Sequence, residues 1–206
     1  SNCTVSNCSA SSDGGGIYAF SGPSSYVSNC TVSNCSATSG GGIYAYSSSV
    51  SNCTVSNCSA TYGGGIYANS SSIHNCASSN NLSNGITGSG ISISGASSAN
   101  CISPDINLAY LHPTSFIGIA TTEAQKQELL TADWHLKAGS PCINAGTTIG
   151  LSQDFLNGKD LDNHPRVLYG TIDIGAYEFM SPSVQIPISE NFDVISDWSQ
   201  STLFSF

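Results

Sequence analysis

Residues 1–10 read Ser-Asn-Cys-Thr-Val-Ser-Asn-Cys-Ser-Ala, and the same ten residues return at 28–37 and at 51–60. A second phrase, Gly-Gly-Gly-Ile-Tyr-Ala, follows each copy and starts at Gly14, Gly40 and Gly63. The copies are 27 and then 23 residues apart. A period this short predicts a solenoid in which each repeat forms one coil and buries its apolar face only against its neighbours.

The alternation of residues within the repeat predicts two strands in each coil. In Cys-Thr-Val-Ser, the Cys and Val side chains point inward, and the Thr and Ser side chains point outward. The three glycines permit a tight bend, after which Ile17, Ile43 and Ile66 are expected to be buried. Between the strands lies a turn at which stacked side-chain amides can form a hydrogen-bonded ladder, at Asn7, Asn34 and Asn57.

The chain has nine cysteines, and most of them recur at two fixed positions of the coil. They are expected to stack in two internal columns, with Cys3, Cys30, Cys53 and Cys76 in one and Cys8, Cys35 and Cys58 in the other. Side chains in register point in the same direction rather than at each other, which disfavours disulfides between coils. Free, packed thiols also fit the odd count. Disulfide bonding remains the alternative.

Charge is scarce and unevenly placed. Only 8% of the 206 residues are charged, and the net charge is −9 with a pI near 4.4. The first hundred residues hold a single carboxylate, Asp13, and all four basic residues follow residue 125. Nucleic acids and anionic membranes need clustered Lys and Arg, so neither is an expected partner. No run of 18 apolar residues is present, so no membrane span is expected.

The repeat resembles a known bacterial family. A Gly-Gly-Gly-Ile phrase paired with a strand that ends in Asn is similar to the repeats of polymorphic outer membrane proteins and related right-handed parallel β-helices. The similarity covers residues 1 to about 76. It departs from that family at Val-Ser-Asn, where the family has Phe and two residues before Asn. The resemblance implies a right-handed β-helix, and the departure concerns a family-specific adhesin role.

A second resemblance covers the C-terminal part. Residues 133–146 (Asp-Trp-His-Leu-Lys-Ala-Gly-Ser-Pro-Cys-Ile-Asn-Ala-Gly), residues 160–166 and residues 171–178 resemble the choice-of-anchor Q domain. That domain ends β-helical regions of secreted bacterial proteins, especially in the Bacteroidetes. The resemblance implies export and surface attachment. An open solenoid end needs covering, so we expect a terminal cap whose core is Trp134, Leu136, Ile143, Ile172, Ile174 and Tyr177.

Three segments follow from these patterns. Residues 1–101 are the β-helix repeats, and the repeat decays after Ile73, with Ile86, Ile91 and Ile93 still at strand-like spacing. Residues 102–180 are the cap, with one short helix over 124–130 that begins after Thr121-Thr122. Residues 181–206 are a linker and the start of a β-sandwich module, so we expect the chain to be a piece of a longer protein.

Sites for catalysis or metal binding are few. Glycoside hydrolysis needs a pair of carboxylates, and no coil supplies one. The loop with Asp154, Asn157, Asp160, Asp162 and Asn163 can offer oxygens to calcium, but turn residues without EF-hand spacing are the favoured interpretation. We therefore expect no cofactor. A buried ion-pair set is expected for Arg166, Asp173 and Glu178. The histidines (His74, His112, His135 and His164) share no metal-ligand spacing.

Two outward stripes remain as candidate binding surfaces. Thr4, Thr31 and Thr54 beside Ser6, Ser33 and Ser56 form a flat hydroxyl face, for which an ice-binding role is disfavoured. The tyrosine stripe can form an aromatic platform on which a sugar chain or a partner protein stacks. The alternative is that the C-terminal segment or a neighbouring chain covers it. The stripe comprises Tyr18, Tyr44 and Tyr67, flanked by Phe20 and Tyr46.

The sequence therefore predicts an all-β protein, a right-handed parallel β-helix of four to five coils with about 23 residues each, closed by a C-terminal cap. The expected function is a non-catalytic structural or adhesive segment of a secreted or cell-surface bacterial protein. It contacts glycans or a surface protein through the tyrosine stripe. The first alternative is part of a β-helical polysaccharide lyase or glycosidase whose active site lies in other coils. The second is a subunit of a filament or surface layer.

Overall fold

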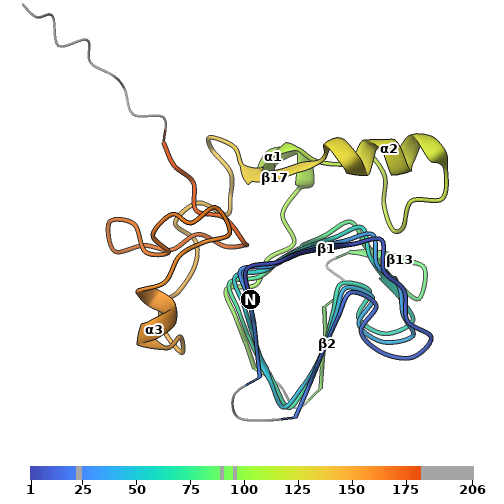
Figure 1. Cartoon of the computed structure of the whole chain (residues 1–206), viewed down its shortest axis with the longest axis horizontal. Helices are drawn as coiled ribbons and strands as arrows, with labels where there is room; N and C mark the ends of the chain where they lie inside the picture. Colours follow the sequence, from blue (N-terminus) through green and yellow to red (C-terminus); the bar gives the residue numbers. More distant parts are fainter. Residues whose placement is uncertain (22–24, 89–90, 95–96, 182–206) are drawn as a thin grey trace, which may run out of the picture.

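A computed structural model describes residues 1–21, 25–88, 91–94 and 97–181. The repeats form the stacked coils of a parallel β-helix, which Figure 1 shows along the axis of the stack. Three parallel sheets run along the solenoid, and each holds four strands, one from each coil. The expected β-sandwich start after residue 181 lies outside the described residues.

The threonine sheet holds the first strand of each coil. In its first three strands, Thr lies opposite Thr, Val opposite Val and Ser opposite Ser. A slip of one residue would turn the valines outward, so the repeat itself specifies this register. The strands are β1 (Thr4–Ser6), β4 (Thr31–Ser33), β7 (Thr54–Ser56) and β11 (Ala77–Ser79).

Two further sheets complete the wall of each coil. The tyrosine sheet consists of β2 (Ile17–Phe20), β5 (Ile43–Tyr46), β9 (Ile66–Asn69) and β14 (Ile91–Ser94). The third sheet consists of β3 (Tyr26–Ser28), β6 (Ser49–Ser51), β10 (Ser72–His74) and β15 (Ser97–Ala99). All pairs within these two sheets are parallel.

A shorter sheet breaks the parallel order. β8 (Ser59–Ala60) pairs in parallel with β12 (Asn81–Ser83), which then pairs antiparallel with β13 (Ile86–Gly88). The hairpin turns at Asn84-Gly85, where both residues have positive φ, as a type I′ turn requires. Strands do continue beyond Ile73, as the isoleucine spacing predicts, but the hairpin was not predicted.

The predicted columns fill the interior of the coils. Val32, Val55, Ile43 and Ile66 are fully buried. All nine cysteines are free thiols, which agrees with the favoured interpretation. Each buried thiol of the two columns donates a hydrogen bond to the carbonyl oxygen two residues earlier, as Cys53 does to Ser51 at 3.3 Å. The fully buried members are Cys30, Cys35, Cys53, Cys58 and Cys76.

The C-terminal segment, residues 102–181, contains helices and one small sheet. α2 (Glu123–Thr131) is the predicted helix, and a capping box of Thr122 and Gln125 begins it. β16 (Tyr110–His112) pairs antiparallel with β17 (Asp133–Leu136). Within the part of the chain that the structure describes, no helix is long and apolar enough to cross a membrane.

The prediction of a single helix in this segment is wrong. α1 (Ile106–Ala109) and α3 (Gln153–Leu156) are additional one-turn helices. Asp105 caps α1 and Ser152 caps α3, each by accepting a backbone N–H. Four residues show no helical period in a sequence, so caps and tertiary contacts decide such turns.

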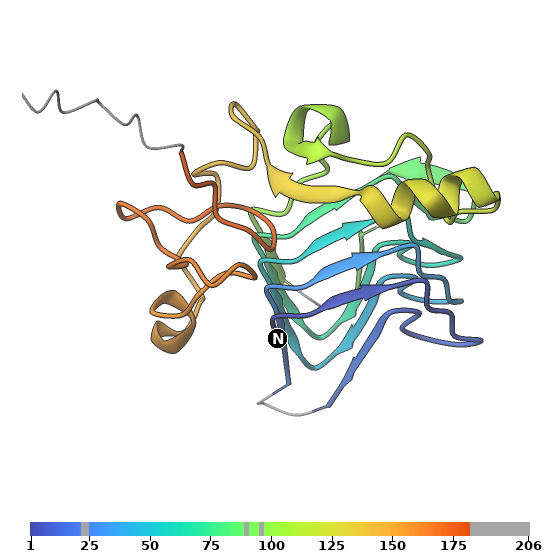
Figure 2. The ribbon, with the colours of Figure 1, turned by 45° about the horizontal axis from the view of Figure 1, so that its top comes forward.

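The C-terminal segment lies beside the coils, over the threonine sheet and its corner with the third sheet (Figures 1 and 2). The expected position on the open end of the solenoid is therefore wrong. Asparagine side chains at both edges of the threonine sheet hold the segment in place. Asn57 donates to the carbonyl oxygen of Phe116 at 2.6 Å, and Asn52 to that of Asp173 at 2.9 Å. The side-chain amides of asparagines at the turns carry N–H groups that point out of the stack. Carbonyl oxygens of the C-terminal segment accept hydrogen bonds from them.

The hydroxyl face is consequently not a free surface. Thr31, Thr54, Ser33 and Ser56 are buried, and Thr54 Oγ1 accepts a hydrogen bond from the Ala176 N–H at 3.1 Å. The expectation of an outward face is corrected for these coils. Side chains at these positions do point away from the coil interior, but the segment covers them. Its predicted core is confirmed, with four residues buried (Trp134, Leu136, Ile172 and Ile174) and two partly buried against them (Ile143 and Tyr177).

Candidate functional site

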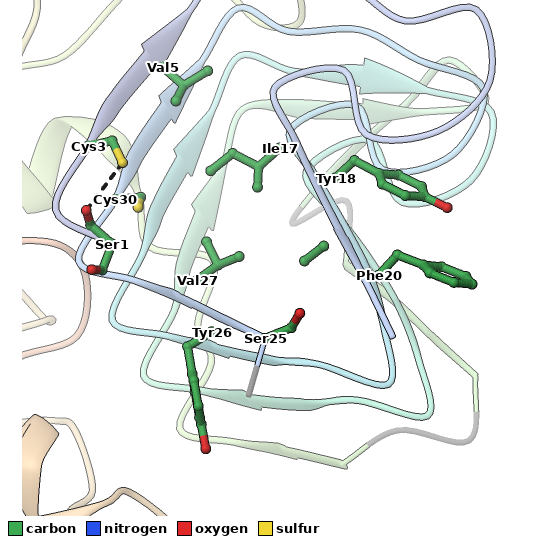
Figure 3. Close-up of a pocket in the computed structure, with 11 residues that line it drawn as sticks. Ser1, Cys3, Val5, Ile17, Tyr18, Phe20, Ser25, Tyr26, Val27 and Cys30 are labelled. Carbon is green, nitrogen blue, oxygen red and sulfur yellow. Dashed lines mark hydrogen bonds between the residues drawn. The ribbon is translucent and has the colours of Figure 1, made fainter. Parts of the chain in front are cut away.

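The structure brings the five residues of the tyrosine stripe together on the outer face of the tyrosine sheet. Parallel register places Tyr18 beside Tyr44, Tyr44 beside Tyr67, and Phe20 beside Tyr46. Successive side chains of a strand point to opposite faces of the sheet. Because the isoleucine before each tyrosine points inward, the tyrosine points outward. Figure 3 shows this for the first coil, where Ile17 points into the coil and Tyr18 and Phe20 point out of it.

The aromatic rings form two parallel columns. Ring centroids in the first column are 5.2 Å apart for Tyr18–Tyr44 and 5.3 Å for Tyr44–Tyr67, with interplanar angles of 9° and 10°. Phe20 and Tyr46 form the second column at 5.1 Å. Carbon atoms in optimal contact are about 3.5–4.0 Å apart. Because the centroids are farther apart than this, nearly parallel rings touch only when each ring is displaced sideways relative to its neighbour. Each ring then exposes part of its face.

Among the described residues, no segment covers the outer side of the stripe. Tyr18 is 53% exposed and Phe20 is 54% exposed, while the other three rings are half-buried by their neighbours in the columns. The C-terminal segment covers a different face of the solenoid (Figure 1). Burial raises the pKa of the Tyr44 hydroxyl, and the carboxylate of Asp13 adds to the rise. The Tyr44 hydroxyl is therefore neutral near pH 7 and can donate a hydrogen bond.

A groove of about 430 Å³ runs beside the stripe and is lined by serines from three coils. Ser21, Ser47 and Ser70 directly follow the outermost residues of β2, β5 and β9. These three serines adopt positive φ at the corner between the tyrosine sheet and the third sheet. Aromatic faces and hydroxyl groups therefore lie side by side along the solenoid axis.

The N-terminal end of the solenoid is hollow. An opening of about 630 Å³ is lined by residues of the first coil, among them Cys3, Val5 and Ile17 (Figure 3). Val5 is only partly buried, whereas Val32 and Val55 at the same position of later coils are fully buried. The opening leads into the interior of the first coil, and its lining residues include no Asp, Glu, His, Lys or Arg.

A second groove, of about 430 Å³, lies between the first coils and the C-terminal segment. His135 on β17 lines this groove, and its ring contacts two carboxylates. Its Nδ1 contacts a carboxylate oxygen of Asp133, its Nε2 lies 2.5 Å from Asp162, and its ring lies 4.1 Å from the ring of Tyr177. Burial lowers the pKa of His135, but hydrogen bonds to Asp133 and Asp162 outweigh burial and raise it. Both nitrogens thus have carboxylate partners within the protein.

Two members of the predicted ion-pair set, Arg166 and Glu178, pair with each other, and all three members, Asp173 included, are almost fully buried. Arg166 Nε lies 3.2 Å from Glu178 Oε1, and the guanidinium donates to the carbonyl oxygens of Asp173, Gly175 and Ala176. Burial raises the pKa of Glu178 to about 8, although Arg166 opposes the rise. The side chain of Asp173 accepts N–H groups of Asn144 and Phe179 instead of pairing directly with Arg166. The set stabilises the segment.

The oxygen-rich loop uses several of its oxygens within the protein. Asp160 is buried and accepts N–H groups from Asp162, His164 and Glu178, and Asp162 contacts His135. Asp154 lies in the first turn of α3. Among the described residues, no group of three or more His, Cys, Asp or Glu side chains is arranged around a common metal position. Turn residues without a cofactor stay the prediction for this loop, and calcium stays the alternative.

Sequence reasoning missed one set of residues that positions the C-terminal segment. Asn29, Asn52 and Asn75 form a second asparagine column, adopt positive φ, and donate to the carbonyl oxygens of residues 159, 173 and 147. The Asn at the second position of each decapeptide, which recurs before Cys76 as Asn75, was the available signal. A strand-flanking Asn in every coil indicates a left-handed turn with a spare amide.

The geometry defines a solenoid of the parallel β-helix class with an aromatic stripe on one face. The family described as "Right handed beta helix region" matches residues 1–105, about half of the chain, and the protein belongs to that family. No curated protein and no solved structure matches the chain. Membership establishes the right-handed fold of the coils, which occurs both in enzymes and in proteins without catalytic activity.

Proposed function

We propose that this chain is a non-catalytic structural and adhesive segment of a secreted or cell-surface bacterial protein, and that it binds carbohydrate through the tyrosine stripe. The observation that carries the proposal is the pair of open aromatic columns beside the serine groove. Aromatic faces pack against the C–H faces of sugar rings, and hydroxyl groups pair with their edges. Contiguous exposed aromatic surface on a soluble domain commonly marks a binding site.

The rest of the repeat surface supports binding without catalysis. The coils contribute one carboxylate, Asp13, and no Lys or Arg over residues 1–100. Hydrolysis of a glycosidic bond by paired carboxylates needs a second acid at the same site. The lyase or glycosidase alternative places its site in other coils. It predicts release of reducing or unsaturated sugars by the full-length protein.

The test compares the chain with its Tyr44→Ala/Tyr67→Ala variant on a printed array of oligosaccharides. The variant should bind at least about tenfold more weakly, a loss of about 1.4 kcal/mol, because two of the three rings of the first column are gone. Tyr169→Asn is the matched control, since Tyr169 is fully exposed on the C-terminal segment and has a positive φ that Asn tolerates.

Circular dichroism of both variants checks that the coils stay folded. Equal binding by the double variant and the parent would remove the stripe as the binding site. Ordered polymers of the chain in electron micrographs would favour the filament or surface-layer alternative, in which the stripe contacts protein.

A further inference from the structure

The spacing of the stripe restricts the shape of its ligand. The rings recur once per coil along the solenoid axis, with centroids 5.1–5.3 Å apart in both columns. In an extended β-1,4-linked pyranose chain, equatorial bonds at both linkage positions keep the chain straight, and one sugar ring follows another at nearly this distance. A chain laid along the axis therefore meets one aromatic ring with each sugar. Chains that curve, such as β-1,3-linked glucans, lose this match after a few sugars.

The width of the stripe fits a flat ribbon. Tyr18 and Phe20 lie side by side with centroids 5.9 Å apart and ring planes within 7° of each other. Two parallel columns thus form a strip two rings wide. A β-1,4-linked chain is itself a ribbon with apolar C–H faces and hydroxyl edges. Its face would lie on the columns, and one edge would lie along the serine groove that follows Phe20 and Tyr46.

The charges select against acidic glycans. Asp13 lies near Tyr44, close enough for its charge to act on the tyrosine hydroxyl. Residues 1–100 contain no Lys or Arg, and the whole chain has a net charge of −9. A uronic acid or a sulfated sugar would therefore be repelled and would find no cationic partner in the coils.

We infer that the ligand of the tyrosine stripe is a neutral, extended β-1,4-linked polysaccharide that runs parallel to the solenoid axis, with one sugar ring per coil. This inference rests on the proposed function and names the ligand class of the same site. Its first consequence concerns chain length. The first column has three rings, so affinity rises from a disaccharide to a trisaccharide and then changes little.

The experiment is isothermal titration calorimetry of the whole chain with named oligosaccharides. Cellotriose should bind about tenfold more tightly than cellobiose, a gain of about 1.4 kcal/mol, and cellohexaose should bind similarly to cellotriose. Binding should be insensitive to added salt, since the stripe and this ligand form no ion pairs. Laminarihexaose, which is β-1,3-linked, and oligogalacturonate, which is acidic, should bind at least about tenfold more weakly than cellohexaose.

Two substitutions extend or interrupt the columns. Asn69 follows Tyr46 in the second column, so Asn69→Tyr should lengthen that column to three rings and raise cellohexaose affinity about tenfold. Tyr44→Ala removes the middle ring of the first column, which a disaccharide uses in either of its two positions there, and should weaken both cellohexaose and cellobiose at least about tenfold. Tyr169→Asn should leave both unchanged.

The outcomes separate the inference from the proposed function. If the stripe binds acidic, branched or β-1,3-linked glycans in preference to cellohexaose, the ligand class is wrong and the proposed function stands. Cellohexaose binding that neither Tyr44→Ala nor Asn69→Tyr alters would place the sugar elsewhere and overturn the inference. If no glycan binds in a stripe-dependent way, the inference and the proposed function fail together.

Discussion

The repeat coils and the C-terminal segment are stabilised in opposite ways. In the coils, identical residues stack in columns, the interior is apolar, and within the stack each coil contacts only the adjacent coils. The C-terminal segment has little regular structure and is organised around a buried arginine with three buried carboxylic acids. A solenoid can spread its stability over many equal contacts, whereas an irregular segment depends on a few that have no substitute.

The largest expected effect lies in the C-terminal segment. Arg166→Met should lower the free energy of unfolding by about 3–5 kcal/mol, because Asp160, Asp173 and Glu178 would be left buried without their cation. Urea denaturation followed by circular dichroism measures the change. Lys126→Met is the control, since Lys126 pairs with Glu123 at 2.7 Å on the exposed surface of α2 and should contribute less than about 0.5 kcal/mol.

Hydrogen exchange sharpens this prediction. In Arg166→Met, amides of residues 142–178 should exchange faster, while those of β4, β5 and β7 keep most of their protection. The added substitution Glu178→Gln should recover part of the lost stability, because it removes one carboxylic acid that can ionise. Equal loss of protection in both regions would show that the coils and the segment unfold as one unit.

A somewhat smaller effect is expected at a glycine where the backbones of neighbouring coils lie close together. A Cβ added at Gly41 would lie 2.4 Å from the carbonyl oxygens of Ser59 and Gly64, both in the next coil. Backbone atoms cannot move aside as a flexible side chain can, so Gly41→Ala should destabilise the chain by about 2–3 kcal/mol. Thermal unfolding measures it.

Gly139→Ala in the C-terminal segment is the matched control for Gly41→Ala. Its Cβ would meet nothing within 4 Å, but its φ is +81°, so only backbone strain of about 1 kcal/mol is expected. If the two variants were equally destabilised, close approach of the coils would not be what requires glycine at position 41.

The cysteine columns allow a test within the coils alone. Cys53 is fully buried, whereas Cys3 at the same position of the first coil is exposed. Cys53→Ser puts a more polar group into an apolar column and should lower stability by about 1–2 kcal/mol, while Cys3→Ser should change it little. In a thiol-reagent titration, Cys3 should react first, and nine thiols should react after denaturation without reductant. Fewer than nine would reveal disulfides.

The fold of the coils was predictable because the sequence pattern that specifies it recurs in each repeat. Cys-Thr-Val-Ser specifies the same inward and outward pattern three times, and one wrong register would expose Val5, Val32 and Val55 together. The five aromatic residues of the stripe followed from the same alternation. Their stacking geometry and the open outer face needed the structure, because a sequence does not say where a distant segment docks.

The position of the C-terminal segment was not predictable by the same reasoning. Thr31 and Thr54 face outward by alternation, and nothing local indicates that Ala176 and its neighbours cover them. The asparagine columns held the only signal, namely spare amides along the side of the stack. α1 and α3 were missed because single turns depend on Asp105 and Ser152 as caps and on tertiary contacts.

The smallest expected effect depends on pH and lies where the two regions meet. His135 contacts Asp133 and Asp162, with Tyr177 against its ring, His112 at 4.0 Å from Asp133, and Asp160 behind Asp162. Burial alone would raise the pKa of Asp133, but hydrogen bonds from His135 outweigh burial and lower it. The pKa of His135 is raised. The lowered pKa favours ionised Asp133 and the raised pKa favours protonated His135, so both shifts stabilise the same ion pair.

The directions of the two pKa shifts define the pH range in which this contact stabilises the protein. The contribution of His135 is fully present below its ordinary pKa of about 6.5 and is lost as pH rises through its raised pKa. That of Asp133 is present above about 3.9 and is lost as pH falls through its lowered pKa. His135→Gln should therefore reduce stability most between about pH 4 and 6.5, by less than about 1 kcal/mol because the side chains are partly exposed.

The measurement is the difference in unfolding free energy between His135→Gln and the parent at pH 5 and at pH 8.5. Taking this difference removes the contribution of Glu178, whose proton is released in the same range in both proteins. His112→Gln is the matched control, because His112 is mostly exposed and lies farther from the Asp133 carboxylate. A difference for His135→Gln that is as large at pH 8.5 as at pH 5 would show that the ring acts by packing on Tyr177. The boundary between the coils and the segment would then hold no titrating contact at His135.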